Sequence, residues 1–146
     1  MKTLKNVLLL LLLTAWGCSV KPNPIDYGND SCHFCKMTIV DKVHGAELVT
    51  NKGKTYKFDA SECMINFMNQ FEDSLEIKLY LTNHYKEPEI LIDATNATFL
   101  ISEKVPSPMG AFLTAFKNKV DAEKTQSEKG GILFSWEELL VQRKKL

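Results

Sequence analysis

The sequence has no excess of charge of either sign, because eighteen Lys and Arg residues balance eighteen Asp and Glu residues over 146 positions. Proteins that grip nucleic acid normally carry a basic stripe, so we expect no nucleic-acid partner. Four cysteines are too few for a disulfide scaffold. No Ser-His-Asp order, phosphate-cradling glycine loop or carboxylate pair is recognisable. We therefore expect a protein that is not an enzyme.

The sequence also lacks an apolar run of the about 20 residues that a membrane-spanning helix needs. Its first residues instead show the pattern of a secretory signal, with two lysines, an apolar run over Val7–Leu13 and small residues before Cys18. The Gly-Cys pair at the end resembles a bacterial lipobox, in which the cysteine is acylated and becomes the mature N-terminus. We predict a lipoprotein signal peptide over residues 1–17 and lipidation at Cys18. The alternative is an ordinary cleaved signal with an incidental cysteine.

A lipoprotein of this kind is anchored to the inner or outer bacterial membrane through acylated Cys18 and faces the periplasm. Thiols outside the cytoplasm tend to form disulfides unless a metal or a reductant protects them. Acylation leaves Cys32, Cys35 and Cys63, and an odd count means that at least one thiol stays free or binds something. Residues 18–31 contain two prolines and several turn formers, and they predict a tether from the lipid to the domain.

Hydrophobic content of 45% and charged content of 25% are typical of a globular protein, and the remaining length suits one domain. The periodicity predicts an α+β fold, with two small β-β-α-β units over residues of about 32–82 and 88–146 that form one compact domain. In the first unit we expect strands at Met37–Val40, Gly45–Thr50, Thr55–Phe58 and Leu75–Leu81, and a helix from Ala60 to about Phe71 with Asp59 as its N-cap.

The second unit repeats this order of elements, although no residue identity is visible between the two. We expect strands at Ile90–Asp93 and Thr98–Ile101, a rigid loop over Val105–Gly110, a helix from Ala111 to about Gln126, a strand at Ile132–Phe134 and a last helix capped by Ser135.

The stretch from Cys32 to Met37 places two thiols and a thioether within six residues. Such soft donors favour Cu(I), Zn(II) or iron–sulfur chemistry over magnesium or calcium. On a strand, Cys35 and Met37 would project to the same side and could hold one ion. Two alternatives stay open: a structural zinc site of Cys32, Cys35, Cys63 and a histidine, and a Cys32–Cys35 redox pair, free or oxidised to a disulfide.

Four further segments appear in a characteristic order after the lipobox: CHFCKMTIVD, KGKTYKFDASECM, SPMGAFLTAF and EKGGILFSWEEL. Together with the lipobox they resemble the NosL family, the outward-facing copper-binding lipoproteins associated with nitrous oxide reductase maturation. The resemblance runs from about Cys32 to Leu140. A Cys-x-x-Cys pair alone is common, but five pieces in this order and spacing are specific.

The resemblance implies that Cu(I) is bound by Cys35, Met37 and Met109, the last of which lies in a Met-Gly loop. It implies a non-enzymatic metallochaperone whose partners are the copper donor and acceptor proteins of nitrous oxide reductase maturation. It also implies a fold of two β-β-α-β units. The chain departs from the family at Lys36, where glycine is common.

Other metal-binding side chains have simpler explanations. Cys63 lies on the apolar face of the predicted helix, so we expect it in the core. His33 and His44 could complete a coordination sphere, but a histidine at the end of a strand is usually solvated. Asp59 is explained as the helix cap.

Overall fold

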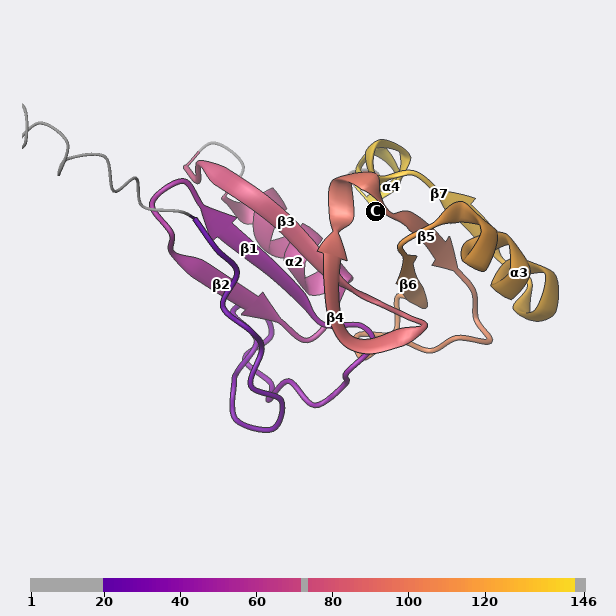
Figure 1. The fold of residues 1–146 in the computed structure, drawn as a ribbon, viewed down its shortest axis with the longest axis horizontal. Coiled ribbons are helices and arrows are strands. Elements are labelled where there is room, and N and C mark those ends of the chain that lie inside the picture. The colour runs from indigo at the N-terminus through magenta and orange to yellow at the C-terminus, as the bar shows by residue number, and fades with distance from the viewer. Residues whose placement is uncertain (1–19, 72–73, 144–146) are drawn as a thin grey trace, which may run out of the picture.

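Two antiparallel sheets form the frame of the computed structural model, which describes residues 20–71 and 74–143 (Figure 1). The predicted signal peptide and the predicted lipidation site, Cys18, lie outside the described residues. None of the helices in the described part is long and apolar enough to cross a membrane. The elements, in chain order, are β1 (Ala46–Thr50), β2 (Thr55–Phe58), α2 (Ser61–Gln70), β3 (Ile77–His84), β4 (Glu87–Asp93), the short 3-10 helix η2 (Ala94–Asn96), β5 (Thr98–Ile101), β6 (Leu113–Phe116), α3 (Lys119–Lys129), β7 (Ile132–Phe134) and α4 (Trp136–Arg143).

The two sheets repeat one arrangement, which confirms the α+β prediction. The first sheet has the order β2-β1-β3-β4 and the second has the order β6-β5-β7. In each sheet the first strand of the unit, β1 or β5, lies between the other two. The second strand, β2 or β6, lies on one side of it, and the strand that follows the helix, β3 or β7, lies on the other. Strand β4 does not belong to the second unit, as the sequence predicted, because it pairs with β3 and extends the first sheet.

One continuous hydrophobic core joins the two units. It includes Leu48 and Phe58 from the first sheet, Phe99 from the second and Trp136 from α4. The Trp136 ring packs between units, with its centroid 5.8 Å from that of Phe99 and 5.9 Å from that of Tyr80. Because aromatic side chains bury large apolar areas, this shared core holds the units together as one domain.

Two predicted elements are wrong. The helix expected from Ala111 is instead strand β6, followed by helix α3, whose N-cap Asn118 accepts a hydrogen bond from the backbone N–H of Asp121. All four residues of β6 are buried, and a short buried apolar run has the same pattern in a helix and in a strand. The strand expected at Met37–Val40 is reduced to a single bridge between Ser31 and Thr38.

The segment predicted to be a tether packs against the first sheet. The backbone N–H of Asn23 donates to the buried Glu47 carboxylate at 2.8 Å, and the Lys57 ammonium donates to Asp30 at 2.6 Å. Ile25 is buried among core residues. The folded domain therefore begins before Cys32.

Candidate metal centre

Three thiols and a carboxylate meet at one end of the first unit. The potential ligand atoms of Cys32, Cys35, Asp59 and Cys63 all lie within 4.8 Å of one another, and we call this group the thiol cluster. Cys32 and Cys35 come from a turn, Asp59 follows β2, and Cys63 lies in the first turn of α2. The three cysteines are free thiols. Segments far apart in sequence thus form a compact set of metal-binding donors.

The turn that carries Cys32 and Cys35 is closed by its own backbone. The N–H of Cys32 donates to the carbonyl of Met37 at 2.8 Å, and the N–H of Lys36 donates to the carbonyl of Cys32 at 3.1 Å. Lys36 has φ of 67°, in the left-handed region that glycine occupies without steric cost. Cys35 and Met37 therefore flank a left-handed residue instead of projecting to one side of a strand, which corrects the predicted geometry.

The carboxylate of Asp59 points into the thiol cluster and does not cap α2. The N-cap position belongs to Ala60, and no side chain caps the helix there. Asp59 is 2% exposed, and its Oδ2 accepts a hydrogen bond from the Cys35 thiol at 3.5 Å. Its other oxygen, Oδ1, is buried and has no hydrogen-bond partner among the residues that the structure describes. The prediction that Asp59 is a cap is therefore wrong.

The three thiols of the cluster differ in the direction in which their surroundings shift the pKa. A hydrogen bond from Cys63 lowers the pKa of Cys32 to about 6 against the opposing effect of burial, and the backbone N–H groups of Asp59, Cys35 and Phe34 lower it further. The same hydrogen bond, together with burial, raises the pKa of Cys63. Burial and the neighbouring Cys32 raise the pKa of Cys35. Cys32 is therefore the sulfur that this environment stabilises as a thiolate.

The two predicted methionine ligands lie at the surface. Met37 is 50% exposed and directly follows the turn of the thiol cluster, and Met109 is 41% exposed in the loop before β6. Both side chains are therefore partly accessible from solvent.

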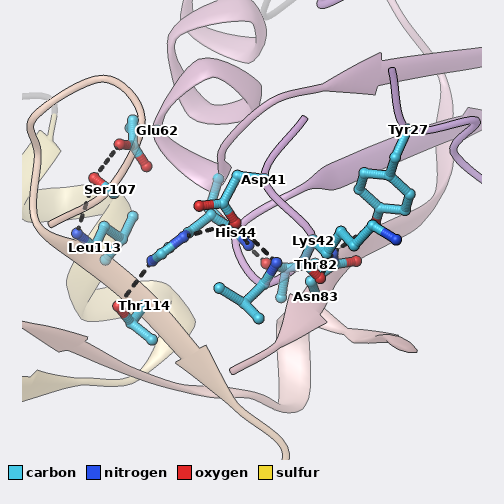
Figure 2. Close-up of polar contacts among 12 residues, drawn as sticks. Tyr27, Asp41, Lys42, His44, Glu62, Thr82, Asn83, Ser107, Leu113 and Thr114 are labelled. Carbon is cyan, nitrogen blue, oxygen red and sulfur yellow. Dashed lines mark hydrogen bonds and ion pairs between the residues drawn. The ribbon is translucent and has the colours of Figure 1, made fainter. Parts of the chain in front are cut away.

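A hydrogen bond joins the loop that contains Met109 to helix α2 (Figure 2). The hydroxyl of Ser107 donates to the carboxylate of Glu62, which is the neighbour of Cys63 in the chain, and it accepts from the N–H of Leu113 at 3.4 Å. A backbone bond from Gly110 to the Ser107 carbonyl closes the turn that holds Met109. The Glu62–Ser107 contact therefore connects the Met109 loop to the helix that carries part of the thiol cluster.

The histidines have other partners. The Nδ1 atom of His33 accepts a hydrogen bond from the N–H of Lys57 at 3.0 Å. His44 is buried between the units, with Nδ1 3.0 Å from the Asp41 carboxylate and Nε2 3.4 Å from the Thr114 hydroxyl (Figure 2). In the part of the chain that the structure describes, no histidine joins the thiol cluster, and Asp59 is its fourth donor.

Sequence reasoning placed Cys63 beside Cys32 and Cys35 only in the zinc alternative, and it missed Asp59 altogether. Cys63 is fully buried, as predicted, yet it also faces the other thiols. One signal could have indicated a wider site: the odd number of thiols predicted to remain once Cys18 is acylated.

Comparisons with known proteins agree with the family resemblance and with the fold. The NosL family matches residues 24–142. The chain is similar to the copper-binding lipoprotein NosL of Stutzerimonas stutzeri, with 30% identity over 151 aligned positions that cover 94% of this chain and 78% of that protein. It is also similar to the crystal structure of the copper chaperone NosL from Shewanella denitrificans, with a TM-score of 0.71, 24% identity and coverage of 82% of this chain and 96% of that one.

Proposed function

The chain belongs to the NosL family, and on that premise we propose that it binds Cu(I) as cargo and passes it to a partner protein. The observation that carries this proposal is the gathering of soft sulfur donors at one end of the fold. Thiolates and thioethers suit Cu(I) and disfavour hard cations such as Mg²⁺. The donor chemistry of the site therefore fits the metal that the name of its relative specifies.

We assign the Cu(I) cargo to Cys35, Met37 and Met109. Cys35 is the partly exposed member of the thiol cluster, and both methionines are exposed, so a partner can reach the ion. The Glu62–Ser107 contact holds the Met109 loop against α2 and limits how far the loop can move away. Two thioethers and one thiolate bind a monovalent soft ion with little excess charge, which allows ligand exchange with an incoming donor.

The setting of this transfer is proposed from the family. The protein is a lipoprotein with a signal peptide over residues 1–17, acylated at Cys18 and anchored at the membrane facing the periplasm. It is not an enzyme, and it supplies copper for the maturation of nitrous oxide reductase during denitrification. Its partners are a copper donor and a copper acceptor of that pathway.

A role as a thiol–disulfide oxidoreductase fits the geometry less well. The attacking sulfur of such an enzyme is a thiolate that a substrate disulfide can reach. Cys32 is the thiolate that this fold favours, yet it is only 1% exposed. The accessible thiol, Cys35, has a raised pKa.

The assignment is tested by competition between the purified protein and a Cu(I) chelator. We expect about one Cu(I) per chain, and a weakening of at least about tenfold in Cys35→Ala or Met37→Leu, since each lost ligand costs about 1.4 kcal/mol or more. Met109→Leu should have a similar or smaller effect. Replacement by leucine removes sulfur while nearly preserving volume.

Met68→Leu is the matched control, because Met68 lines an apolar cavity with Leu75 and Leu140 and is not a proposed ligand. Unchanged Cu(I) affinity in Cys35→Ala would refute the site. A loss of Cu(I) affinity in Met68→Leu equal to that in Met37→Leu would show that the effect does not depend on the place of Met37 beside the thiol cluster.

A further inference from the structure

The N-terminal segment of the described chain is bound along the first sheet. We call residues 20–30 the N-terminal strap. The side chain of Ile25 packs on Gly45, just before β1. Two residues earlier, the backbone N–H of Asn23 donates to the carboxylate of Glu47, inside β1, at 2.8 Å. The strap therefore runs antiparallel to β1, and its first residues lie at the end of β1 that leads into β2 (Figure 1).

The strap is stiff and short where it leaves the domain. Pro22 and Pro24 fix their own φ angles and keep the residues before them extended. The Lys57 ammonium holds this stretch on the sheet by donating to the Pro24 carbonyl at 2.8 Å. Only Ser19 separates the described chain from the predicted lipidation site, Cys18, and two residues of chain span at most about 7 Å. Acyl chains at Cys18 would therefore hold the bilayer close to the end of the sheet where β1 turns into β2.

This end of the first unit exposes side chains that suit a lipid surface. It consists of the turn between β1 and β2 and the stretch after α2, which are joined by a hydrogen bond from the N–H of Asn51 to the Glu76 carbonyl at 2.8 Å. Lys52 and Lys54 are exposed in the turn, and Phe71, at the C-terminal end of α2, is 42% exposed. An exposed aromatic ring and basic side chains at one surface suit the interface of a bilayer, because the ring enters the headgroup region and the ammonium groups meet phosphates.

A recess of about 480 Å³ opens at the same end of the unit. Its walls include both lysines of the turn, the Tyr56 ring and Leu75, and the Lys54 ammonium lies 4.6 Å from the centre of the Tyr56 ring. Leu75 also lines an apolar cavity together with Phe71, so the lysines and the exposed ring belong to one surface. Glu76 adds a carboxylate to the wall of the recess. A phosphatidylethanolamine headgroup offers a partner to each charge, since its phosphate pairs with lysine and its ammonium with glutamate.

We propose that the Asn51–Lys54 turn, together with Phe71 and Leu75, is the surface with which the lipidated domain rests on phospholipid headgroups. This inference rests on the acylation of Cys18 in the proposed function and adds the surface that meets the bilayer. The strand β2 separates the turn from Asp59 by about 16 Å, at about 3.3 Å per residue. The thiol cluster then faces away from the bilayer, where a partner protein in the aqueous compartment reaches it without meeting lipid.

The test uses the acylated chain, reduced and free of metal, in nanodiscs of phosphatidylethanolamine and phosphatidylglycerol. Some headgroups carry a gadolinium chelate, which broadens the NMR signals of nearby backbone amides, and discs with a lanthanum chelate give the reference. We expect the amides of Lys52 and Lys54 to lose most of their intensity. Those of Lys36 and Lys86, at the other end of the sheet, should keep theirs. Equal losses at both ends, or a larger loss at Lys36, would overturn the proposal.

Charge reversal tests whether the lysines of the turn make the contact. The double variant Lys52→Glu/Lys54→Glu places carboxylates against lipid phosphates, so its turn amides should lose less signal than those of the wild type. Lys86→Glu/Lys129→Glu is the matched control, because both lysines are exposed and lie outside this end of the first unit, and it should behave as the wild type does. Wild-type losses in the first variant would overturn the assignment of Lys52 and Lys54. Thermal unfolding of both variants checks that they are folded.

The lipid surface and the proposed function fail in different ways. Mass spectrometry of the same sample shows whether Cys18 carries acyl chains. A chain without them would refute the predicted anchor and this inference together, whereas an acylated chain with equal losses at both ends would refute the inference alone. Absence of Cu(I) binding in the chelator competition would refute the copper cargo and leave the lipid surface standing.

Discussion

The contact between Glu62 and Ser107 offers a sharp test of how the second unit contributes to the site. Glu62 is 2% exposed and Ser107 is 8% exposed, and the serine hydroxyl donates to the carboxylate (Figure 2). Glu62→Ala removes this hydrogen bond and leaves the Ser107 hydroxyl without its acceptor. A hydrogen bond to a charged group contributes about 1.5–3 kcal/mol to stability.

Part of that loss is offset, because Glu62 Oε2 is itself buried with no hydrogen-bond partner in residues 20–71 and 74–143, and alanine removes this atom. We therefore expect Glu62→Ala to lower the free energy of unfolding by about 2 kcal/mol. Ser107→Ala should cost more, about 3 kcal/mol, because it removes the hydrogen-bond donor that the described part of the chain gives the buried carboxylate. The double variant should cost less than the sum of the two single changes, as expected for groups in contact.

Urea denaturation of the four proteins measures these energies, and competition with a Cu(I) chelator measures the functional consequence. Once the loop is released, Met109 is no longer held near α2, and we expect the Cu(I) affinity of Glu62→Ala to fall to that of Met109→Leu. Glu123→Ala is the matched control, because Glu123 forms an exposed 3.5 Å ion pair with Lys119, and such pairs contribute about 0–1 kcal/mol. An unfolding free energy of Glu62→Ala equal to that of the control would refute this reasoning.

Two further predictions concern stability. Gly131 has φ of 104°, and an added Cβ would lie 2.2 Å from the Ile101 carbonyl oxygen, so Gly131→Ala should lose about 3 kcal/mol or more in urea denaturation. Gly130 has φ of 71° and ψ of −169°, also a conformation used almost only by glycine, but it has open space around a new Cβ. Gly130→Ala should therefore lose less than Gly131→Ala, about 1–2 kcal/mol, and equal losses would refute the steric argument. Burial tends to raise the pKa of Asp41, but the His44 ring and nearby N–H groups hold it below the ordinary value of 3.8. The stability that Asp41 contributes is therefore present above pH 3.8 and lost as the pH falls through its folded-state pKa. In urea denaturation measured at a series of acid pH values, Asp41→Asn should lose less stability than the wild type over this range. An identical pH dependence in the two proteins would contradict this account.

The proposed site depends on both units, although all of its cysteines belong to the first. The second unit contributes Met109 through a loop, and contacts between the two units position that loop. His44 and Thr114 form one such contact at 3.4 Å, and the backbone N–H of Tyr85 donates to Ala115 at 2.9 Å to form another. Weakening these contacts between the two units should therefore lower the affinity for the metal as well as the stability of the fold.

The sequence by itself determined the elements that depend on local pattern. The Asn51–Lys54 turn places β1 and β2 as a hairpin, and the Ser135 cap, which exchanges hydrogen bonds with Glu138, starts α4. The ordered motifs also identified the family, and the α+β class followed from the periodicity. These features can be predicted because turn chemistry, caps and alternation act over a few neighbouring residues.

Only the tertiary structure decided what forms through distant contacts. Leu113–Phe116 is a strand because it pairs with β5, and the run of four buried residues did not distinguish this from a helix. Asp59 and Cys63 join Cys32 and Cys35 because β2 and α2 bring them there, across more than twenty residues of chain. A side chain that fits a local role, such as a cap or a core thiol, can serve a site only when the packing of other segments places the partners beside it.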